Sequence, residues 1–338
     1  MFILRHLAVL INVSLRYNLF IKEMDSNLNT DKAQYKTPWF VWYISVTIIA
    51  QYFLINYKEN FTTINPETFT LFGAPDTVHI YEGQFWGVFT NNFIHIYWGQ
   101  LVVNLIGIWF FGAFIERRLG TLRLISLMVI SCVIPSLAQL ALTSEPGIGL
   151  SGVNYALFGY ILIRSKNGAA FKLKGQYIFL TFMLGVLAYC NYYNFFIENI
   201  FRTEAMSIGL LLGLLLGKVR YGKQINRVII VSGISILAIS TLFYAPWSPE
   251  WQLYKGVQCH EARDLVNAKK FYNKVLEMDA DNQTAKSNLK LINVEKLEEK
   301  AYNAHVAKKY DLARKYYLEI LKEKPGDAWA KENLKELP

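Results

Sequence analysis

Residues 147–160 read GIGLSGVNYALFGY, a glycine-rich loop followed directly by an apolar run. The pattern predicts that Ser151 lies at the N-terminus of a helix, behind a flexible loop. The first backbone N–H groups of a helix have no partner within it, so this end can stabilise an oxyanion. The stretch therefore combines a hydroxyl group with a place that favours negative charge.

A second pattern follows in residues 205–217, where glycine recurs at every fourth position as Gly209, Gly213 and Gly217. Such a stripe lets a neighbouring helix approach until the two backbones touch. The run after Ser151 carries a matching stripe of small residues, which is formed by Gly152, Ala156 and Gly159. We therefore expect these two helices to pack tightly against each other.

Both runs belong to a series of apolar segments. Residues of the AVILMFWYC set make up 53% of the chain and aromatic residues 15%, which argues against an ordinary soluble enzyme. Because about 20 mostly apolar residues cross a bilayer, the sequence predicts seven spans, at residues 39–57, 94–115, 121–142, 151–164, 176–193, 205–217 and 228–246. The fourth and sixth are short, which is tolerable where a span ends in protein or in a water-filled cavity.

The charged residues divide the chain at Ser248. Residues 1–248 hold 29 charged side chains, whereas the last 90 residues hold 32. We expect an all-α protein: a cytoplasmic or interfacial N-terminal segment (1–36), a polytopic membrane helix bundle (37–247) and a soluble helical repeat domain (248–338). The basic residues of the membrane part lie in short loops rather than in one patch with aromatic residues, which argues against a nucleic-acid partner.

The loops also predict an orientation in the membrane. Basic residues gather before the first span and near residues 117–123, 164–174 and 218–227, whereas the opposite loops hold only Lys58 and Arg202 as basic residues. By the positive-inside rule, the N-terminus is cytoplasmic. Seven spans then place the repeat domain on the non-cytoplasmic side. Residues 1–20 are apolar but interrupted by charge, and we expect them to lie at the interface rather than to span the membrane or act as a signal peptide.

The C-terminal domain repeats itself at a spacing of 45 residues, so that residues 268–290 recur at 313–335. Small residues followed one turn later by aromatic ones resemble the tetratricopeptide repeat, whose key positions would be Gly256, Ala268 and Tyr272, then Ala301, Ala313, Tyr317 and Pro325. The repeat of that family is 34 residues long, so an insertion of about three turns would separate the copies. An unspecific charged helical hairpin is the alternative.

Polar residues within membrane spans usually have a function. His95, Gln100 and Asn104 interrupt the second apolar segment, with Gln100 and Asn104 one turn apart on one face. Three cysteines, Cys132, Cys190 and Cys259, are scattered without a histidine at ligand spacing. We therefore expect no metal, no cofactor and no disulfide framework.

These residues together resemble the rhomboid family of intramembrane serine proteases. The resemblance is carried by GQFWGVFTNNFIH (83–95), the polar set of the second span, GAFIERRLG (112–120), GLSGVNYALFGY (149–160) and the glycine stripe. It implies that Ser151 is the nucleophile and that a histidine three residues before the stripe is its base. It also implies an oxyanion hole formed with an asparagine and a histidine of the second helix. Ser151, Asn104, His95 and Tyr155 match, as do the structural glycines Gly149, Gly152, Gly209 and Gly213.

Three positions depart from the family pattern. Gln100 replaces the second-helix histidine, Trp86 is followed by Gly87 rather than by arginine, and Met206 replaces the base histidine. A thioether cannot take the proton of a serine hydroxyl, which is a poor nucleophile without a base. Gln100 is less damaging because its amide can still donate a hydrogen bond to an oxyanion.

Each of these residues also has a structural interpretation. Ser151 could cap its helix, Gln100 and Asn104 could join helices by hydrogen bonds, and Met206 could fill space. Glu204, His95 and His79 are the remaining candidates for a substitute base.

The sequence therefore predicts a rhomboid-like pseudoprotease in the bilayer that binds transmembrane helices of client proteins, with a repeat domain for a protein partner. The alternative is an active intramembrane serine endopeptidase that cleaves transmembrane substrates with an unrecognised base. A transporter is disfavoured because the spans show no repeat in halves and no series of intramembrane acids or bases.

Overall fold

The structure, a computed structural model, describes residues 37–58, 66–143, 146–165, 176–196, 203–218 and 225–338. The chain divides into two compact units, with the boundary between Ala245 and Pro246. This is two residues before the boundary expected from the sequence. The described residues form helices and no strands. The expected N-terminal segment, residues 1–36, lies outside the described residues.

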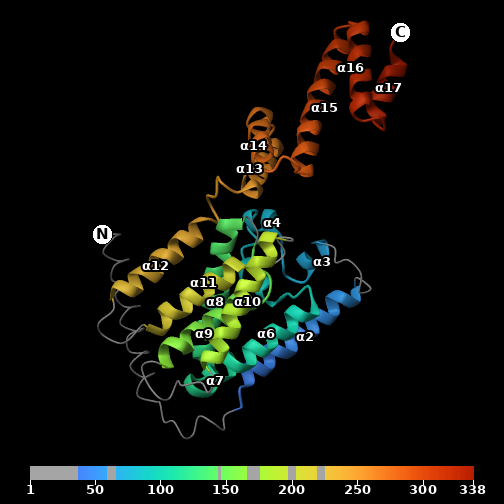
Figure 1. Ribbon diagram of the computed structural model, residues 1–338. Helices are drawn as coiled ribbons and strands as arrows, with labels where there is room; N and C mark the ends of the chain where they lie inside the picture. Colours follow the sequence, from blue (N-terminus) through green and yellow to red (C-terminus); the bar gives the residue numbers. More distant parts are fainter. Residues whose placement is uncertain (1–36, 59–65, 144–145, 166–175, 197–202, 219–224) are drawn as a thin grey trace. The chain divides into compact units, whose positions relative to one another are not determined.

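The first unit is a bundle of helices (Figure 1). Its elements are α2 (Trp39–Lys58), α3 (Pro66–Leu71), α4 (Thr77–Tyr81), α5 (Gly87–Thr90), η2 (Asn91–Phe93), α6 (Trp98–Gly107), the π-helix η3 (Ile108–Gly112), α7 (Ala113–Leu119), α8 (Thr121–Thr143), α9 (Ser151–Ser165), α10 (Gln176–Phe196), α11 (Thr203–Lys218) and α12 (Ile225–Ser240).

Three helical stretches of the described chain are long and apolar enough to cross a membrane. They are α2, the continuous run Trp98–Leu119 formed by α6, η3 and α7, and α8. The helices α9, α11 and α12 have 15, 16 and 16 residues, fewer than the about 20 of a full span. The count of seven spans therefore stays a prediction.

The second expected span begins later than its sequence suggests. We expected it from residue 94, but α6 starts at Trp98. Residues 94–97 form a non-helical connection, with extended backbone at Ile94 and Tyr97. His95 therefore precedes the helix instead of lying within it.

Glu116 joins three helices at one end of the bundle. Its carboxyl oxygens accept hydrogen bonds from the backbone N–H groups of Phe40 and Val41, at 3.0 and 3.1 Å, and from the Thr121 hydroxyl at 2.8 Å. Glu116 belongs to α7, and Thr121 is the first residue of α8. The two N–H groups lie in the first turn of α2, where the helix itself provides no acceptor. A carboxyl group at a helix N-terminus is favourable, so Glu116 fixes the ends of these helices relative to one another.

The helix α9 lies at the centre of the first unit. From Gly152 to Ser165 every residue except Leu162 is buried. A helix that is apolar on all sides belongs inside a bundle, and α9 packs against α11, α8, α6 and η3. Central position explains how a helix of only 15 residues is accommodated, because its ends lie in protein.

The two stripes of small residues face each other, as expected. A β-carbon at Gly209 would overlap the carbonyl oxygen of Gly152, and one at Gly213 would overlap the carbonyl oxygen of Ala156. One at Gly217 would lie 2.8 Å from the carbonyl oxygen of Tyr160. The helices α9 and α11 are thus in backbone contact along most of their length.

The second unit consists of α13 (Pro249–Glu261), α14 (Leu265–Met278), α15 (Gln283–Val306), α16 (Tyr310–Glu323) and α17 (Ala328–Glu336). Successive helices pack against each other, and Figure 1 shows α15 as one long helix. It has 24 residues against the 13 of α13. The insertion of about three turns expected between the two copies therefore lies within α15, which it lengthens.

The 45-residue period is also present in the structure of the second unit. Ala268 and Tyr272 are fully buried, as are Ala313 and Tyr317 at the same positions of the second copy. Gly256 leaves room for an aromatic ring, because a β-carbon there would lie 2.5 Å from Tyr272.

The structure shows two further pairs of equivalent positions at the 45-residue spacing, which the sequence pattern alone did not reveal. His260 and His305 each lie within hydrogen-bond distance of the buried tyrosine of their copy, with Nδ1 to hydroxyl distances of 3.5 and 3.0 Å. Arg263 and Lys308, which follow the first helix of each pair, both have the left-handed backbone conformation, with φ of 61° and 56°.

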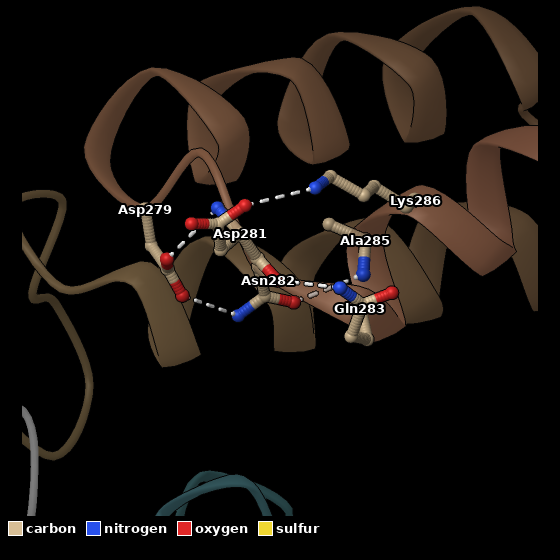
Figure 2. A network of polar contacts seen from close by, with 6 residues as sticks. All are labelled: Asp279, Asp281, Asn282, Gln283, Ala285 and Lys286. Atoms are coloured by element: carbon tan, nitrogen blue, oxygen red, sulfur yellow. Dashed lines mark hydrogen bonds and ion pairs between the residues drawn. The ribbon is translucent and has the colours of Figure 1, made fainter.

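Polar contacts define the turn between α14 and α15 (Figure 2). Asp279 accepts hydrogen bonds from the Asp281 backbone N–H at 3.2 Å and from Asn282 Nδ2 at 3.1 Å. Asn282 Oδ1 in turn accepts one from the Ala285 N–H at 3.0 Å and so caps α15. The corresponding turn before α17 is capped by Asp327, which accepts from the Ala330 N–H at 2.9 Å. Short polar side chains thus end and begin these helices.

Candidate functional site

Ser151 and Met206 line the same cavity, which has a volume of about 100 Å³. Ser151 is the first residue of α9, and Met206 lies in the first turn of α11. The close contact between α9 and α11 brings these two positions together. The remaining wall comes from α6, η3 and α10, through Val103, Asn104, Ile106, Gly107, Phe110, Phe111, Phe182, Met183 and Val186, and from Asn154 and Tyr155 of α9.

The cavity wall contains no histidine, carboxylate or amine among the described residues. Met206 is buried and presents only a thioether. Ser151 makes no side-chain hydrogen bond with another described residue, so none of the described residues contacts it as a base or receives a capping bond from it. The hydroxyl group of Tyr155 does not donate to Ser151, because it donates to the carbonyl oxygen of Met183 at 2.5 Å.

A chain of hydrogen bonds runs from the connection before α6 to α9. Asn154 Nδ2 lies 3.0 Å from the carbonyl oxygen of Asn104 and 3.1 Å from its Oδ1. Asn104 Nδ2 lies 3.0 Å from His95 Nε2, and His95 Nδ1 lies 3.2 Å from the carbonyl oxygen of Phe93. The two backbone carbonyls can only accept. They fix the direction of every bond between them, so His95 is neutral, with its proton on Nδ1.

Gln100 also acts as a connector. Its Oε1 accepts from the Ile96 N–H at 3.2 Å, and its Nε2 donates to the carbonyl oxygen of Ile148 at 3.1 Å. It thereby ties α6 to the glycine loop before Ser151. A β-carbon at Gly149, where φ is +89°, would lie 2.6 Å from Gln100 Nε2 and 3.3 Å from Asn104 Nδ2. The amide nitrogens of both expected oxyanion donors therefore face this loop, two residues before Ser151.

None of the expected substitute bases lines the cavity. Glu204 is absent from its wall, although it is only two residues from Met206. His79 is partly exposed, with Nδ1 2.9 Å from Asp76 Oδ1. His95 Nε2, the one nitrogen of that ring that could accept a proton, already accepts the hydrogen bond from Asn104.

Residues 82–223 match the family model described as the rhomboid domain. The matched stretch lies within the first unit. It includes Ser151, Met206, Asn104 and Gln100. This match and the three apolar helices long enough to cross a membrane support an integral membrane protein.

Two similar proteins are named rhomboid proteases. Rhomboid protease GluP of Bacillus subtilis (strain 168) is 24% identical over 271 residues, which are 75% of this chain and 52% of GluP. Rhomboid protease GlpG of Salmonella newport (strain SL254) is 36% identical over 84 residues, which are 25% of this chain and 30% of GlpG. The chain therefore spans about half the length of GluP and less than a third of GlpG.

At Gly87, where the sequence resemblance implies an arginine, packing leaves no room for a side chain. A β-carbon there would lie 2.5 Å from Pro75 Cγ and 3.1 Å from Ile80. No side chain fits without movement of these neighbours. The neighbours of Gly87 therefore fit a glycine and not a larger residue.

Asn154 is the polar residue of the cavity that the sequence interpretation did not single out. It is buried and faces Gly107, where a β-carbon would lie 2.6 Å from its carboxamide. An asparagine inside the otherwise apolar run after Ser151 was the available signal. Its partner, Asn104, lies 50 residues away in sequence and could not be identified from spacing.

Proposed function

We propose that this protein is a rhomboid pseudoprotease, which retains the nucleophile position Ser151 and binds transmembrane helices without efficient cleavage. The observation that carries the proposal is the cavity that Ser151 shares with Met206. Met206, a thioether, occupies the position at which the resemblance implies the base histidine. No other described residue of the wall can accept a proton. Loss of one member of such a catalytic pair removes most of the acceleration.

The lining of the cavity supports a transmembrane partner. Val103, Ile106, Phe110 and Phe182 line it and are between 48% and 55% exposed. These side chains belong to α6, η3 and α10, and large exposed apolar side chains on a membrane protein face lipid or another helix. A partner helix that leaves the bilayer can therefore contact the rim of the cavity with apolar side chains.

An active intramembrane endopeptidase is the second candidate. The observation that favours it is that both similar proteins are named rhomboid proteases. Such activity would need a base that reaches Ser151 from outside the described cavity wall.

The two candidates are separated by a cleavage assay with the full chain in lipid. The substrate is a fluorescently tagged transmembrane helix that contains helix-destabilising residues, and the control is Ser151→Ala. The pseudoprotease proposal expects equal, background turnover in both proteins. Cleavage by the unmodified protein that Ser151→Ala abolishes would establish the endopeptidase instead.

We further propose that seven spans place the second unit on the non-cytoplasmic side, where it binds a protein partner as a tetratricopeptide-like module. The loop charges support the topology, and the buried Ala–Tyr pairs of both copies support the repeat. A reporter fused after Pro338 should be non-cytoplasmic and one fused near Gly168 cytoplasmic. Two reporters on the same side would mean that the span count is wrong by one.

A further inference from the structure

The helices α14 and α16 of the second unit have equivalent exposed faces. Six positions of α14 recur 45 residues later in α16: 266, 269, 270, 273, 274 and 277 return as 311, 314, 315, 318, 319 and 322. At spacings of three and four residues they lie on one side of each helix, and every one of them is exposed or partly exposed. We call these positions the outer face of the second unit.

The outer face carries the excess positive charge of the second unit. Its basic residues are Lys269, Lys270, Lys274, Arg314, Lys315 and Lys322, and its acidic residues are Glu277, Asp311 and Glu319. The rest of residues 246–338 holds eleven basic and twelve acidic side chains. A basic pair at positions 269 and 270 returns at positions 314 and 315, so both copies contribute to the charge.

Neighbouring carboxylates do not neutralise the lysines of the outer face. None of these lysines forms an ion pair with a described residue, whereas Lys286, Lys290 and Lys324 elsewhere in the unit each form one. Arg314 donates a hydrogen bond to the carbonyl oxygen of Pro338 at 2.9 Å. The ammonium groups of the face are therefore available to an anionic partner.

Apolar side chains lie among these basic residues. Val266 is 75% exposed in α14, and Leu318 is 53% exposed in α16. Basic and apolar side chains on one helix face are typical of helices that lie at a membrane surface, where the apolar groups enter the headgroup region and the charged ends reach lipid phosphates.

The connection between the two units keeps the outer face near a bilayer. The last apolar helix of the first unit, α12, ends at Ser240, and α13 begins at Pro249. The eight residues between them span at most about 30 Å. Lipid headgroups are therefore present at a high effective concentration, whereas a soluble acidic protein would have to bind from solution.

We propose that the outer face docks on the anionic headgroups of the bilayer that holds the first unit. Its ammonium groups pair with lipid phosphates, and Val266 and Leu318 enter the headgroup region. Docking through α14 and α16 leaves α13, α15 and α17 available to the protein partner proposed above. The inference does not depend on the activity of Ser151, or on which side of the membrane the second unit lies.

Acetylation of lysines in the unmodified full chain tests the docking. The chain is placed in nanodiscs of phosphatidylcholine alone or of phosphatidylcholine with phosphatidylglycerol, and mass spectrometry follows each lysine. The lysines of the outer face should react about threefold slower or more in the anionic nanodiscs, because lipid phosphates hold and cover their ammonium groups. Lys331 and Lys335 of α17, which are exposed and lie outside the face, should react equally in both. Added salt should remove the difference.

Two double variants with the same change of net charge provide the matched comparison. Lys270→Glu with Lys315→Glu reverses the charge at equivalent positions of the two copies. The remaining lysines of the outer face should then lose their protection. Lys331→Glu with Lys335→Glu on α17 should leave the protection of the outer face unchanged.

Equal acetylation in the two kinds of nanodisc would overturn the proposal. Protection that Lys331 and Lys335 share, or that persists in Lys270→Glu with Lys315→Glu, would also overturn it, because the attraction would then not involve the outer face in particular. Protection by added polyglutamate in phosphatidylcholine nanodiscs, without protection by phosphatidylglycerol, would assign the outer face to an acidic protein instead.

Discussion

Gly209 of α11 lies so close to Gly152 of α9 that a β-carbon at position 209 would overlap the carbonyl oxygen of Gly152. Ser151 immediately precedes Gly152, and Met206 lies about one turn before Gly209. The backbone contact therefore holds Ser151 and Met206, the two positions of the proposed catalytic pair, next to the same cavity.

The contact predicts that Gly209→Ala destabilises the first unit. Overpacking of this kind costs about 1–3 kcal/mol, which exceeds the gain of about 1 kcal/mol expected from alanine in a helix. Gly185→Ala in α10 is the matched control, because nothing lies within 4 Å of the added carbon. Thermal unfolding in detergent should show a lower midpoint for Gly209→Ala only. A loss of equal size in both variants would refute the backbone contact.

Met206→His should restore proteolysis if the site lacks only its base. A general base contributes about 10²–10⁴-fold, so cleavage of a helix-destabilised transmembrane substrate should rise well above background. Ser151→Ala in the same variant should abolish the gain. Unchanged turnover, together with no reaction of Ser151 with a fluorophosphonate probe, would mean that the site differs from an active one by more than this residue.

The second unit should be intolerant of charge at Ala313. Its side chain is fully buried between helices, so Ala313→Asp places an unpaired carboxylate in a packed crossing. We expect the soluble fragment 246–338 to lose helical circular dichroism and cooperative melting. Ala328→Asp, at an exposed position in the first turn of α17, should melt like the unmodified fragment. Normal melting of Ala313→Asp would remove the assigned repeat packing.

Asp327 predicts a pH dependence of the same fragment. The Lys324 ammonium group, 2.8 Å away, and the Ala330 N–H lower the pKa of this carboxyl. A carboxyl whose pKa is lower in the folded state stabilises it above the unfolded pKa of about 3.9. This contribution is lost as the pH falls through the folded pKa.

Asp327→Asn keeps a capping side chain but removes the charge. The unmodified fragment should therefore be more stable than Asp327→Asn at neutral pH, and the difference should vanish in strong acid. Urea titrations at several pH values measure it. A difference between the two proteins that is independent of pH would contradict the ion pair.

Much of the first unit could be predicted because its information is local or periodic. The glycine spacing in α11 identified which helix surface approaches α9, and the loop before Ser151 identified the start of α9. The start of α6 was missed because the apolar character of residues 94–97 does not distinguish an extended segment from a helical one.

The hydrogen-bond chain from His95 to Asn154 could not be predicted in the same way. Its members come from different elements, and their pairing depends on how α6 packs against α9. In the second unit, by contrast, the 45-residue period predicted the insertion of about three turns. Residues 283–306 contain neither glycine nor proline, which favours a continuous helix for the inserted residues.

The central claim, that Ser151 has no base, is tested most directly by labelling the unmodified full chain with a fluorophosphonate, which reports nucleophilicity and not access of a large substrate. Mass spectrometry then compares residue 151 in this protein and in Ser151→Ala, with Met206→His as the positive reference. We predict no labelling at Ser151 in the unmodified chain and clear labelling in Met206→His. Labelling of the unmodified chain at Ser151, lost in Ser151→Ala, would contradict the account.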